Sequence, residues 1–364
     1  MNRQLLTQKE CTAMRGIAII AIVLHNYCHF IGRIVKENEY LYHTSNNDRL
    51  LQILTHPDSL LPVHLFSYFG HYGVPVFLFL SGYGLVMKYE SAPICPTSRF
   101  LRYNYLKLLR MLIVGFSLFI CIDMVTPGHF PFHWDKVLAQ LLMYINILPE
   151  PDRIIWPGIY WFFGLMMELY IVYRLLLYRR SSWLAATLIV ICWLLQAFCA
   201  PDGDILNRLR YNCIGGMLPF CLGVLSGRYG GKIIPSVGTI SSQGGNRLFP
   251  AWEQILCMSL ALAASAAAAV MCFNFQTWLW VPVMIIIATA AFVKAMPATI
   301  LTVFTWFGTI SAAMFVAHPI ARKLFITVAW KQDIYDGLML YAIAVIALSW
   351  AVKQIIDRIP KPEL

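Results

Sequence analysis

The chain has 364 residues, of which 59% are hydrophobic and only 13% are charged, and its mean hydropathy is +0.65. A soluble globular protein carries about a quarter charged residues, so this composition excludes a soluble enzyme and predicts a polytopic membrane protein. The net charge of +10 is better explained by orientation in the membrane than by nucleic-acid binding. No long polar stretch interrupts the chain, so we expect a single membrane domain over residues 1–364, without an appended soluble domain.

Ten apolar segments predict an all-α transmembrane helix bundle. We place them at about 13–31, 66–87, 108–126, 158–178, 182–200, 212–227, 253–273, 277–293, 299–321 and 336–356. With the N-terminus in the cytoplasm, most Lys and Arg residues fall on the inner side, as the positive-inside rule requires. Both termini are then cytoplasmic.

The remaining segments carry weaker signals. The largest inner loops are expected at 88–107 and 228–252, and the stretch 137–147 is apolar but too short to span a bilayer. The first apolar segment lacks a small-residue cleavage site, so we interpret it as a retained helix rather than a signal peptide. The ten cysteines include no CxxC pair, and they predict neither a disulfide framework nor a metal site.

Arg15 opens the first apolar segment, and His25 follows ten residues later. A helix rises about 1.5 Å per residue, which places His25 roughly 15 Å deeper than Arg15. His25 and His29 share a helix face. An ionisable side chain inside a membrane is a functional candidate, unless a neighbouring helix simply satisfies it. Imidazole can act as a general base, and Arg15 suits a phosphate or a carboxylate or serves only as a topological anchor.

Two further segments contain polar or small residues in an informative order. The segment 70–84 combines Gly, Pro and Ser81, which predicts close packing against the first helix. Arg102, Lys107 and Arg110 lie at the entry to the third span and could bind a polyanion such as a nucleotide phosphate. Lipid headgroups and simple topology explain the same three charges equally well.

The fourth and ninth predicted helices carry the remaining candidates. Trp161 and its aromatic neighbours suit the outer interface, whereas Glu168 lies in the membrane core and needs a partner or a proton. Tyr170 follows on the same helix. His318 is a second histidine in apolar context, and a capping role before Pro319 is the alternative explanation.

The order of these motifs resembles the membrane-bound acyltransferase-3 family, which consists of bacterial ten-helix enzymes that O-acylate, usually O-acetylate, sugars of surface glycans. The resemblance covers nearly the whole chain. It rests on Arg15 with His25, the segment 73–83, Lys107 with Arg110, Trp161 with Tyr170, and Gly308-x-Ile-Ser followed by His318-Pro319. The family commonly has tyrosines where this chain has Ala312 and Phe315, and any hydrogen bonds from those tyrosines are missing.

The resemblance implies a function and a set of site residues. His25 would be the essential histidine, with Arg15 as its partner in donor handling. The donor- and substrate-binding candidates are Arg102, Lys107, Arg110, His318, Ser81, Trp161, Glu168 and Tyr170. Acetyl-CoA would be the co-substrate, with no tightly bound cofactor, and the acceptor would be a carbohydrate or glycolipid. The protein would be a multi-pass component of the bacterial plasma (inner) membrane.

Two other functions remain open from the sequence. Ten helices with buried charges and a basic face also suit a transporter or flippase of an anionic or glycan substrate. Such a protein often contains a two-fold internal repeat, and we find none in this chain. An inactive family member with a scaffolding role is the third possibility.

Overall fold

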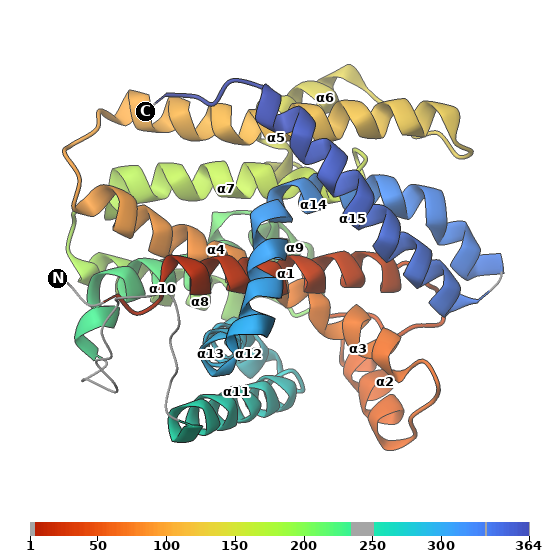
Figure 1. The fold of residues 1–364 in the computed structure, drawn as a ribbon, viewed down its shortest axis with the longest axis horizontal. Helices are drawn as coiled ribbons and strands as arrows, with labels where there is room; N and C mark the ends of the chain where they lie inside the picture. Colours follow the sequence, from red (N-terminus) through yellow and green to blue (C-terminus); the bar gives the residue numbers. More distant parts are fainter. Residues whose placement is uncertain (1–3, 234–250, 332, 364) are drawn as a thin grey trace.

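The computed structural model describes residues 4–233, 251–331 and 333–363, which form a helical bundle (Figure 1). No β-strand occurs within these ranges. Seven helical segments among them are long and apolar enough to cross a membrane, namely Gln8–Cys28, Leu61–Glu90, Thr97–Val125, Gly158–Leu177, Trp252–Met271, Ala298–Lys331 and Ile334–Arg358. The predicted polytopic all-α bundle is therefore confirmed.

The other three predicted spans are helical too, although they do not reach the same length and apolarity. Helices α8 (Ser182–Ala197) and α13 (Val281–Ala295) are short apolar helices, and α10 (Cys213–Ile233) contains Pro219. The expected cytoplasmic location of both termini stays a prediction. The predicted inner loop at 228–252 lies largely outside the described residues.

Two predicted boundaries differ from the structure. The second segment begins earlier, because α3 (Leu61–Phe69), a 3₁₀ turn (Gly70–Tyr72), α4 (Gly73–Leu85) and a π-helical turn (Val86–Glu90) follow one another without a break. The expected inner loop at 88–107 is wrong in its second half, since α5 runs from Thr97 to Val125. Residues 97–107 contain no Gly or Pro, so the helix continues beyond its apolar portion.

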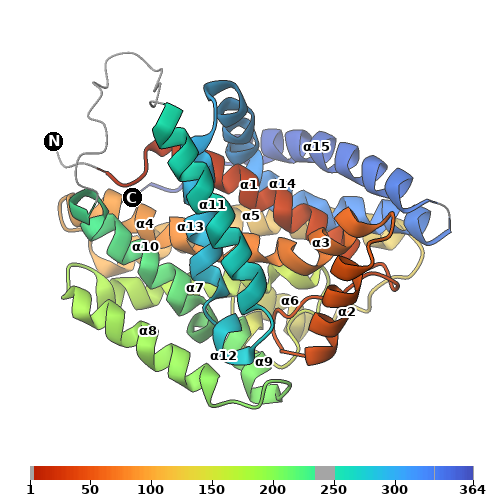
Figure 2. The same ribbon diagram turned by 90° about the horizontal axis from the view of Figure 1, so that it is seen from below.

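The remaining elements complete the bundle (Figures 1 and 2). They are α2 (Thr44–Thr55), α6 (Trp134–Leu141), η3 (Ile145–Ile147), η4 (Gly158–Tyr160), α7 (Trp161–Val172), η5 (Tyr173–Leu177), α9 (Asp204–Tyr211), α11 (Ala251–Met271), α12 (Phe275–Trp278), α14 (Ala298–Lys331) and α15 (Ile334–Arg358). The apolar stretch predicted at 137–147 corresponds to α6 and the short η3, neither of which could span a bilayer.

Helix α1 (Gln8–Cys28) begins at a capping box, in which the Thr7 side chain accepts from the backbone of Glu10 and the Glu10 side chain accepts from the backbone of Thr7. Glycines let two neighbouring segments approach its backbone. A Cβ atom at Gly308 would lie 1.9 Å from the carbonyl oxygen of Thr12, and one at Gly70 would lie 2.6 Å from the Cβ of His25. The predicted close packing of the second segment against α1 is therefore confirmed, and it occurs at His25 itself.

Candidate active site

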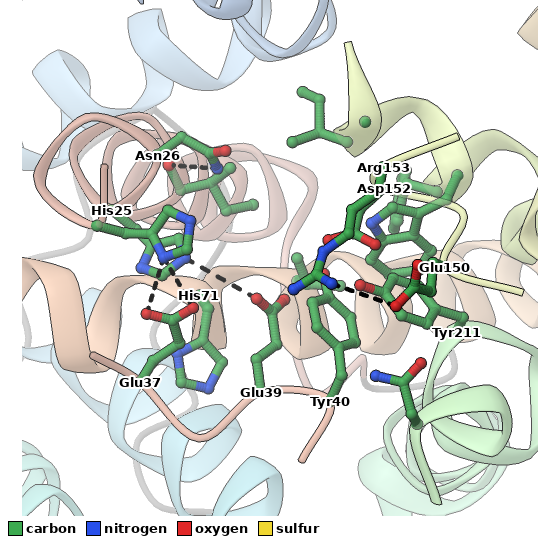
Figure 3. A pocket seen from close by; sticks show the side chains of 18 of the residues that line it. His25, Asn26, Glu37, Glu39, Tyr40, His71, Glu150, Asp152, Arg153 and Tyr211 are labelled. Atoms are coloured by element: carbon green, nitrogen blue, oxygen red, sulfur yellow. Dashed lines mark hydrogen bonds and ion pairs between the residues drawn. The ribbon is translucent and has the colours of Figure 1, made fainter. Parts of the chain in front are cut away.

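A cavity of about 370 Å³ lies between the C-terminal part of α1, the loop that follows α1, the segment before α7, and α9 (Figure 3). It brings together side chains that are far apart in the sequence. His25, Glu39, Tyr40, Trp161, Tyr211 and Arg322 are among the residues that line it. Cavities with a few convergent polar groups on largely aromatic walls are the usual form of a small-molecule site.

His25 is buried on α1, and its two ring nitrogens have different surroundings. Nδ1 lies 2.8 Å from the backbone carbonyl oxygen of Ser67. A carbonyl oxygen can only accept a hydrogen bond, so Nδ1 carries the proton and Nε2 keeps its lone pair. Nε2 lies on the side of Glu39, 3.9 Å from Oε2 of that residue. The imidazole is thus held in the tautomer that a general base needs.

Glu39 lies in the loop after α1, outside the membrane-spanning helices, with a largely buried side chain. Burial and the neighbouring charge of Glu37 raise the pKa of Glu39 to about 8. Its carboxyl group therefore carries a proton near neutral pH. Arg210 fixes the backbone at this point, because its Nε donates to the carbonyl oxygen of Glu39 over 2.9 Å.

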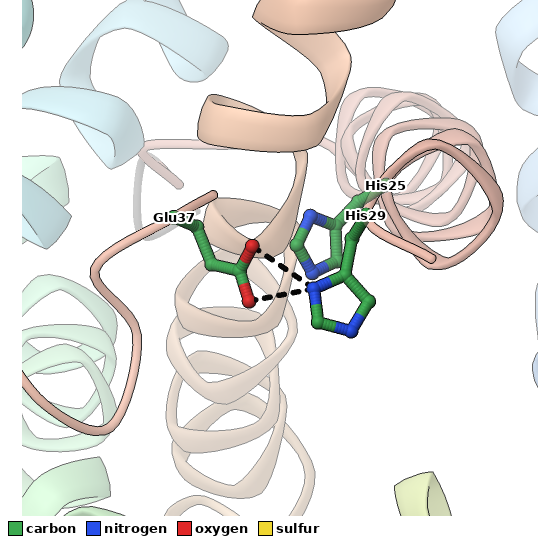
Figure 4. Close-up of side chains that lie close together, drawn as sticks. All are labelled: His25, His29 and Glu37. Carbon is green, nitrogen blue, oxygen red and sulfur yellow. Dashed lines mark hydrogen bonds and ion pairs between the residues drawn. The ribbon is translucent and has the colours of Figure 1, made fainter. Parts of the chain in front are cut away.

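His29 and Glu37 form an ion pair next to His25 (Figure 4). Nδ1 of His29 lies 2.9 and 3.0 Å from the two carboxylate oxygens of Glu37. Burial would raise the pKa of Glu37, but the hydrogen bond with His29 and the neighbouring histidine charges hold it well below its usual range. One ligand atom from each of His25, His29 and Glu37 lies within 4.8 Å of the others, so the three residues could also hold a divalent cation. The sequence shows that His25 and His29 share a helix face, but no spacing marks Glu37 as the third member.

The loop between α1 and α2 is anchored by buried hydrogen bonds, and these bonds position its carboxylates. Ser67 Oγ donates to the carbonyl oxygen of Val35 over 2.6 Å, and the backbone N–H of Val35 donates to His64 Nδ1 over 3.1 Å. Further along the loop, Trp278 Nε1 donates to the carbonyl oxygen of Asn38 over 3.0 Å. Satisfied buried polar groups of this kind rigidify a segment, so we expect Glu37 and Glu39 to keep their places beside α1.

Aromatic rings form the wall of the cavity beyond Glu39. Tyr40 stacks on Tyr211 with ring centroids 3.9 Å apart, and Trp161 meets both rings edge to face. His71 also lines the cavity, and its ring centroid lies 5.6 Å from that of His25. It is buried, and neither of its ring nitrogens has a hydrogen-bond partner among the described residues.

The predicted donor residues lie elsewhere. Arg15 is exposed, is absent from the cavity lining, and lies about 15 Å along α1 from His25 by the helical rise. Lys107 is exposed as well, and the charges of Arg15, Lys88 and Arg110 all act on it. The structure therefore gathers Arg15, Lys107 and Arg110 in one basic cluster that also includes Lys88.

Two predicted residues are engaged outside the cavity. Ser81 donates to the carbonyl oxygen of Phe77 one turn earlier, over 2.8 Å. Glu168 accepts from Asn146 over 2.8 Å and from the backbone N–H of Cys213 over 2.6 Å, which supplies the partners that its position requires.

The other predicted candidates differ in their surroundings. Tyr170 is buried within electrostatic range of Arg15. His318 is fully buried, and its Nδ1 lies 3.0 Å from the carbonyl oxygen of Met314. Arg102 is exposed and makes no contact that joins it to the cluster of Arg15 within the described part of the chain. Of the binding candidates, only Trp161 reaches the cavity of His25.

The predicted site residues do not include Glu37, Glu39, Tyr40 or Arg322. The two glutamates and Tyr40 lie in a polar loop, where the sequence offers no periodicity that would show which side chains turn toward α1. Arg322 did have a signal, because it follows His318 by four residues and therefore shares its helix face.

Comparison with known proteins agrees with this architecture. Residues 10–354 match the family model of the acyltransferase domain of the acyltransferase-3 family. No curated protein matches the chain, and no solved structure matches it. The family match covers nearly the whole helical bundle, including the cavity and the basic cluster. The chain therefore belongs to the acyltransferase-3 family of membrane acyltransferases.

Proposed function

We propose that this protein is an integral-membrane O-acyltransferase that moves an acetyl group from acetyl-CoA to a hydroxyl of a sugar in a surface glycan or glycolipid. The observation that carries the proposal is the orientation of His25. Its Nδ1–H is tied to the carbonyl oxygen of Ser67, and its Nε2 is left to accept a proton within the cavity.

In this reaction His25 acts as the general base. The acceptor hydroxyl transfers its proton to Nε2 while its oxygen attacks the thioester carbonyl carbon. The tetrahedral intermediate collapses, the carbon–sulfur bond breaks, and the CoA thiolate takes the proton from the imidazolium. The neutral carboxyl group of Glu39 beside Nε2 supports this role, because a neutral acid does not hold a proton on the imidazole as a carboxylate would.

The basic cluster is the proposed site for the phosphate groups of the donor. Lys107 is exposed there, with Arg15 and Arg110 nearby. Lysine and arginine side chains bind phosphate through charge-assisted hydrogen bonds. With the N-terminus in the cytoplasm, this cluster faces the cytoplasmic pool of acetyl-CoA, and the His25 cavity lies toward the other side of the membrane.

The cavity supports a carbohydrate acceptor. Its wall combines the stacked rings of Tyr40 and Tyr211 with the edge of Trp161, and carboxyl groups such as those of Glu39 and Asp152 lie beside them. A sugar ring presents apolar C–H faces and a rim of hydroxyl groups, so it can pack on aromatic rings while its hydroxyls meet polar groups.

Glycan mass measurement in the host tests this proposal. A deletion strain is complemented with wild type, His25→Ala or His56→Ala at matched membrane expression. His56 is exposed at the end of α2 and serves as the matched histidine control. We expect wild type and His56→Ala to add one acetyl mass per acceptor sugar and His25→Ala to add none.

The same variants distinguish an enzyme from a transporter. The purified wild-type protein should consume acetyl-CoA without any transmembrane gradient, whereas a transporter would not. Full acetylation by His25→Ala would show that His25 is structural and would contradict the proposed mechanism. If wild type leaves every glycan unchanged and does not consume acetyl-CoA, the transporter alternative replaces the proposal.

A further inference from the structure

Arg322 lies on α14 and lines the cavity of His25. Its side chain is buried, with only 4% of the residue exposed. The guanidinium group lies over the ring of Phe30 at 3.9 Å from the centroid and 5.6 Å from that of Trp156. These two rings orient the planar group and leave its edge for hydrogen bonds.

No carboxylate forms an ion pair with Arg322 among the described residues. Its only hydrogen bonds there are two long ones, from Nη1 to the backbone and side-chain oxygens of Asn26, both 3.3 Å. A buried cation without a counter-charge is strongly unfavourable, and aromatic contacts offset only part of that cost.

Several other cations have a carboxylate partner, whereas Arg210 next to the cavity, like Arg322, has none among the described residues. Lys323, the next residue, pairs with Asp123, and the largely buried Arg228 pairs with Glu90 over 2.6 Å. In the same cavity, Arg153 pairs with Glu150 over 3.2 Å. Arg322 therefore departs from the pattern of its own helix and of its own cavity.

A buried ring nitrogen without a partner lies one turn earlier on α14. His318 is fully buried, and its Nε2 has no hydrogen-bond partner within the described ranges. Residues four apart share a helix face, and the charge of Arg322 acts on His318. A cation without a carboxylate partner and a ring nitrogen without a hydrogen-bond partner thus lie on the same face of α14.

We propose that Arg322 binds an anionic oxygen of a ligand in the His25 cavity. A guanidinium fork suits two sources of such an oxygen. One is a permanent carboxylate or phosphate group on the acceptor. The other source rests on the proposed acyl transfer and is the carbonyl oxygen of the thioester. This oxygen becomes negatively charged when the hydroxyl oxygen attacks the carbonyl carbon, because it takes the π electron pair of the C=O bond. The C=O bond forms again as the CoA thiolate leaves.

Thermal unfolding of the purified protein tests anion binding without requiring turnover. The melting temperature is measured in sodium chloride and in sodium phosphate or sodium glucuronate at equal ionic strength, with glucose as the uncharged comparison. The variants are wild type, Arg322→Met, Arg322→Lys and the control Arg153→Met, which removes an exposed and paired arginine from the same cavity.

For an acceptor-borne anion, phosphate or glucuronate raises the melting temperature of wild type and of Arg153→Met, and does not raise that of Arg322→Met. Arg322→Lys keeps the charge without the fork and should show a reduced shift. An equal rise in the melting temperatures of wild type and Arg322→Met would exclude an anionic group on the acceptor as the ligand of Arg322.

Acetyl transfer from radiolabelled acetyl-CoA to membrane acceptors tests whether Arg322 binds the thioester carbonyl oxygen during the reaction. Arg322→Met should then lower kcat roughly 100-fold or more with an unchanged KM for acetyl-CoA, and Arg322→Lys should recover part of the loss. Unchanged kcat together with an unchanged anion response overturns the proposal. If wild type itself transfers no acetyl group, the proposed function fails, and the melting temperatures alone decide whether Arg322 binds an anion.

Discussion

Replacing Glu39 with glutamine should stabilise the protein in a pH-dependent way. In the folded protein, burial raises the pKa of Glu39 to about 8 from a reference value of 4.5. Between these two values, the unfolded chain ionises the carboxyl group while the folded protein keeps it protonated. The folded state therefore binds the extra proton, and the stability of wild type falls as the pH rises through this window.

The magnitude follows from the width of the window. Each pH unit changes the free energy of unfolding by about 1.4 kcal/mol, so wild type should lose roughly 3 kcal/mol between pH 5 and pH 7.5 through this residue. Glutamine has nearly the same shape and does not ionise. The stability of Glu39→Gln should therefore equal that of wild type near pH 4.5 and exceed it by a growing amount up to pH 8. Above pH 8 the difference in stability should stay constant.

Melting temperatures from pH 4.5 to pH 9 provide the assay, with wild type and Glu39→Gln in the same detergent. Asp204→Asn is the control, because it makes the same change at an exposed carboxyl group on the same cavity. A difference between Glu39→Gln and wild type that stays constant from pH 5 to pH 8 would refute the reasoning, since Glu39 would then ionise alike in the folded and unfolded states.

Three further predictions concern packing, donor binding and metal binding. Gly70→Ala should destabilise the protein by about 1–3 kcal/mol and so lower its melting temperature, because the added methyl group would lie 2.5 Å from the carbonyl oxygen of Ala21. The control Gly84→Ala places its methyl group in open space, and an equal effect of the two substitutions would contradict this packing. Lys107→Gln should raise the KM for acetyl-CoA several-fold and weaken its salt dependence, and an unchanged KM would remove Lys107 from the donor site. Zinc chloride should inhibit acetyl transfer by the wild type, because a zinc ion bound to His25, His29 and Glu37 would block His25. The variant His29→Ala should be less sensitive to zinc, and equal inhibition of both proteins would exclude these three residues as the zinc site.

Helix positions were predictable because apolar segments long enough for a bilayer stand out in any sequence. Helix ends were less predictable. α5 begins at Thr97 rather than near 108, since hydropathy marks the membrane portion and the polar turns with Arg99 and Arg102 continue the same helix. The predicted segment 182–200 corresponds to α8, although the 16 residues of this helix are too few for a straight membrane span.

His25 and Trp161 were selected from the sequence, and both reach the cavity. His318 and Glu168 were selected for the same reason, a polar side chain in apolar context, yet neither lines it. Apolar context shows that a polar residue is buried, but it does not distinguish a residue facing a cavity from one satisfied by a neighbouring helix, as Glu168 is by Asn146. The catalytic roles of His25 and Arg15 remain predictions.

The sequence by itself determined the fold class, the approximate helices and the family, because hydrophobic length and motif order are local properties of the chain. Only the tertiary structure decided which groups surround His25. Its tautomer depends on Ser67, and its carboxyl neighbours come from a loop whose position is fixed by Arg210 and Trp278. These contacts join segments up to 240 residues apart, and they exist only after the helices have packed.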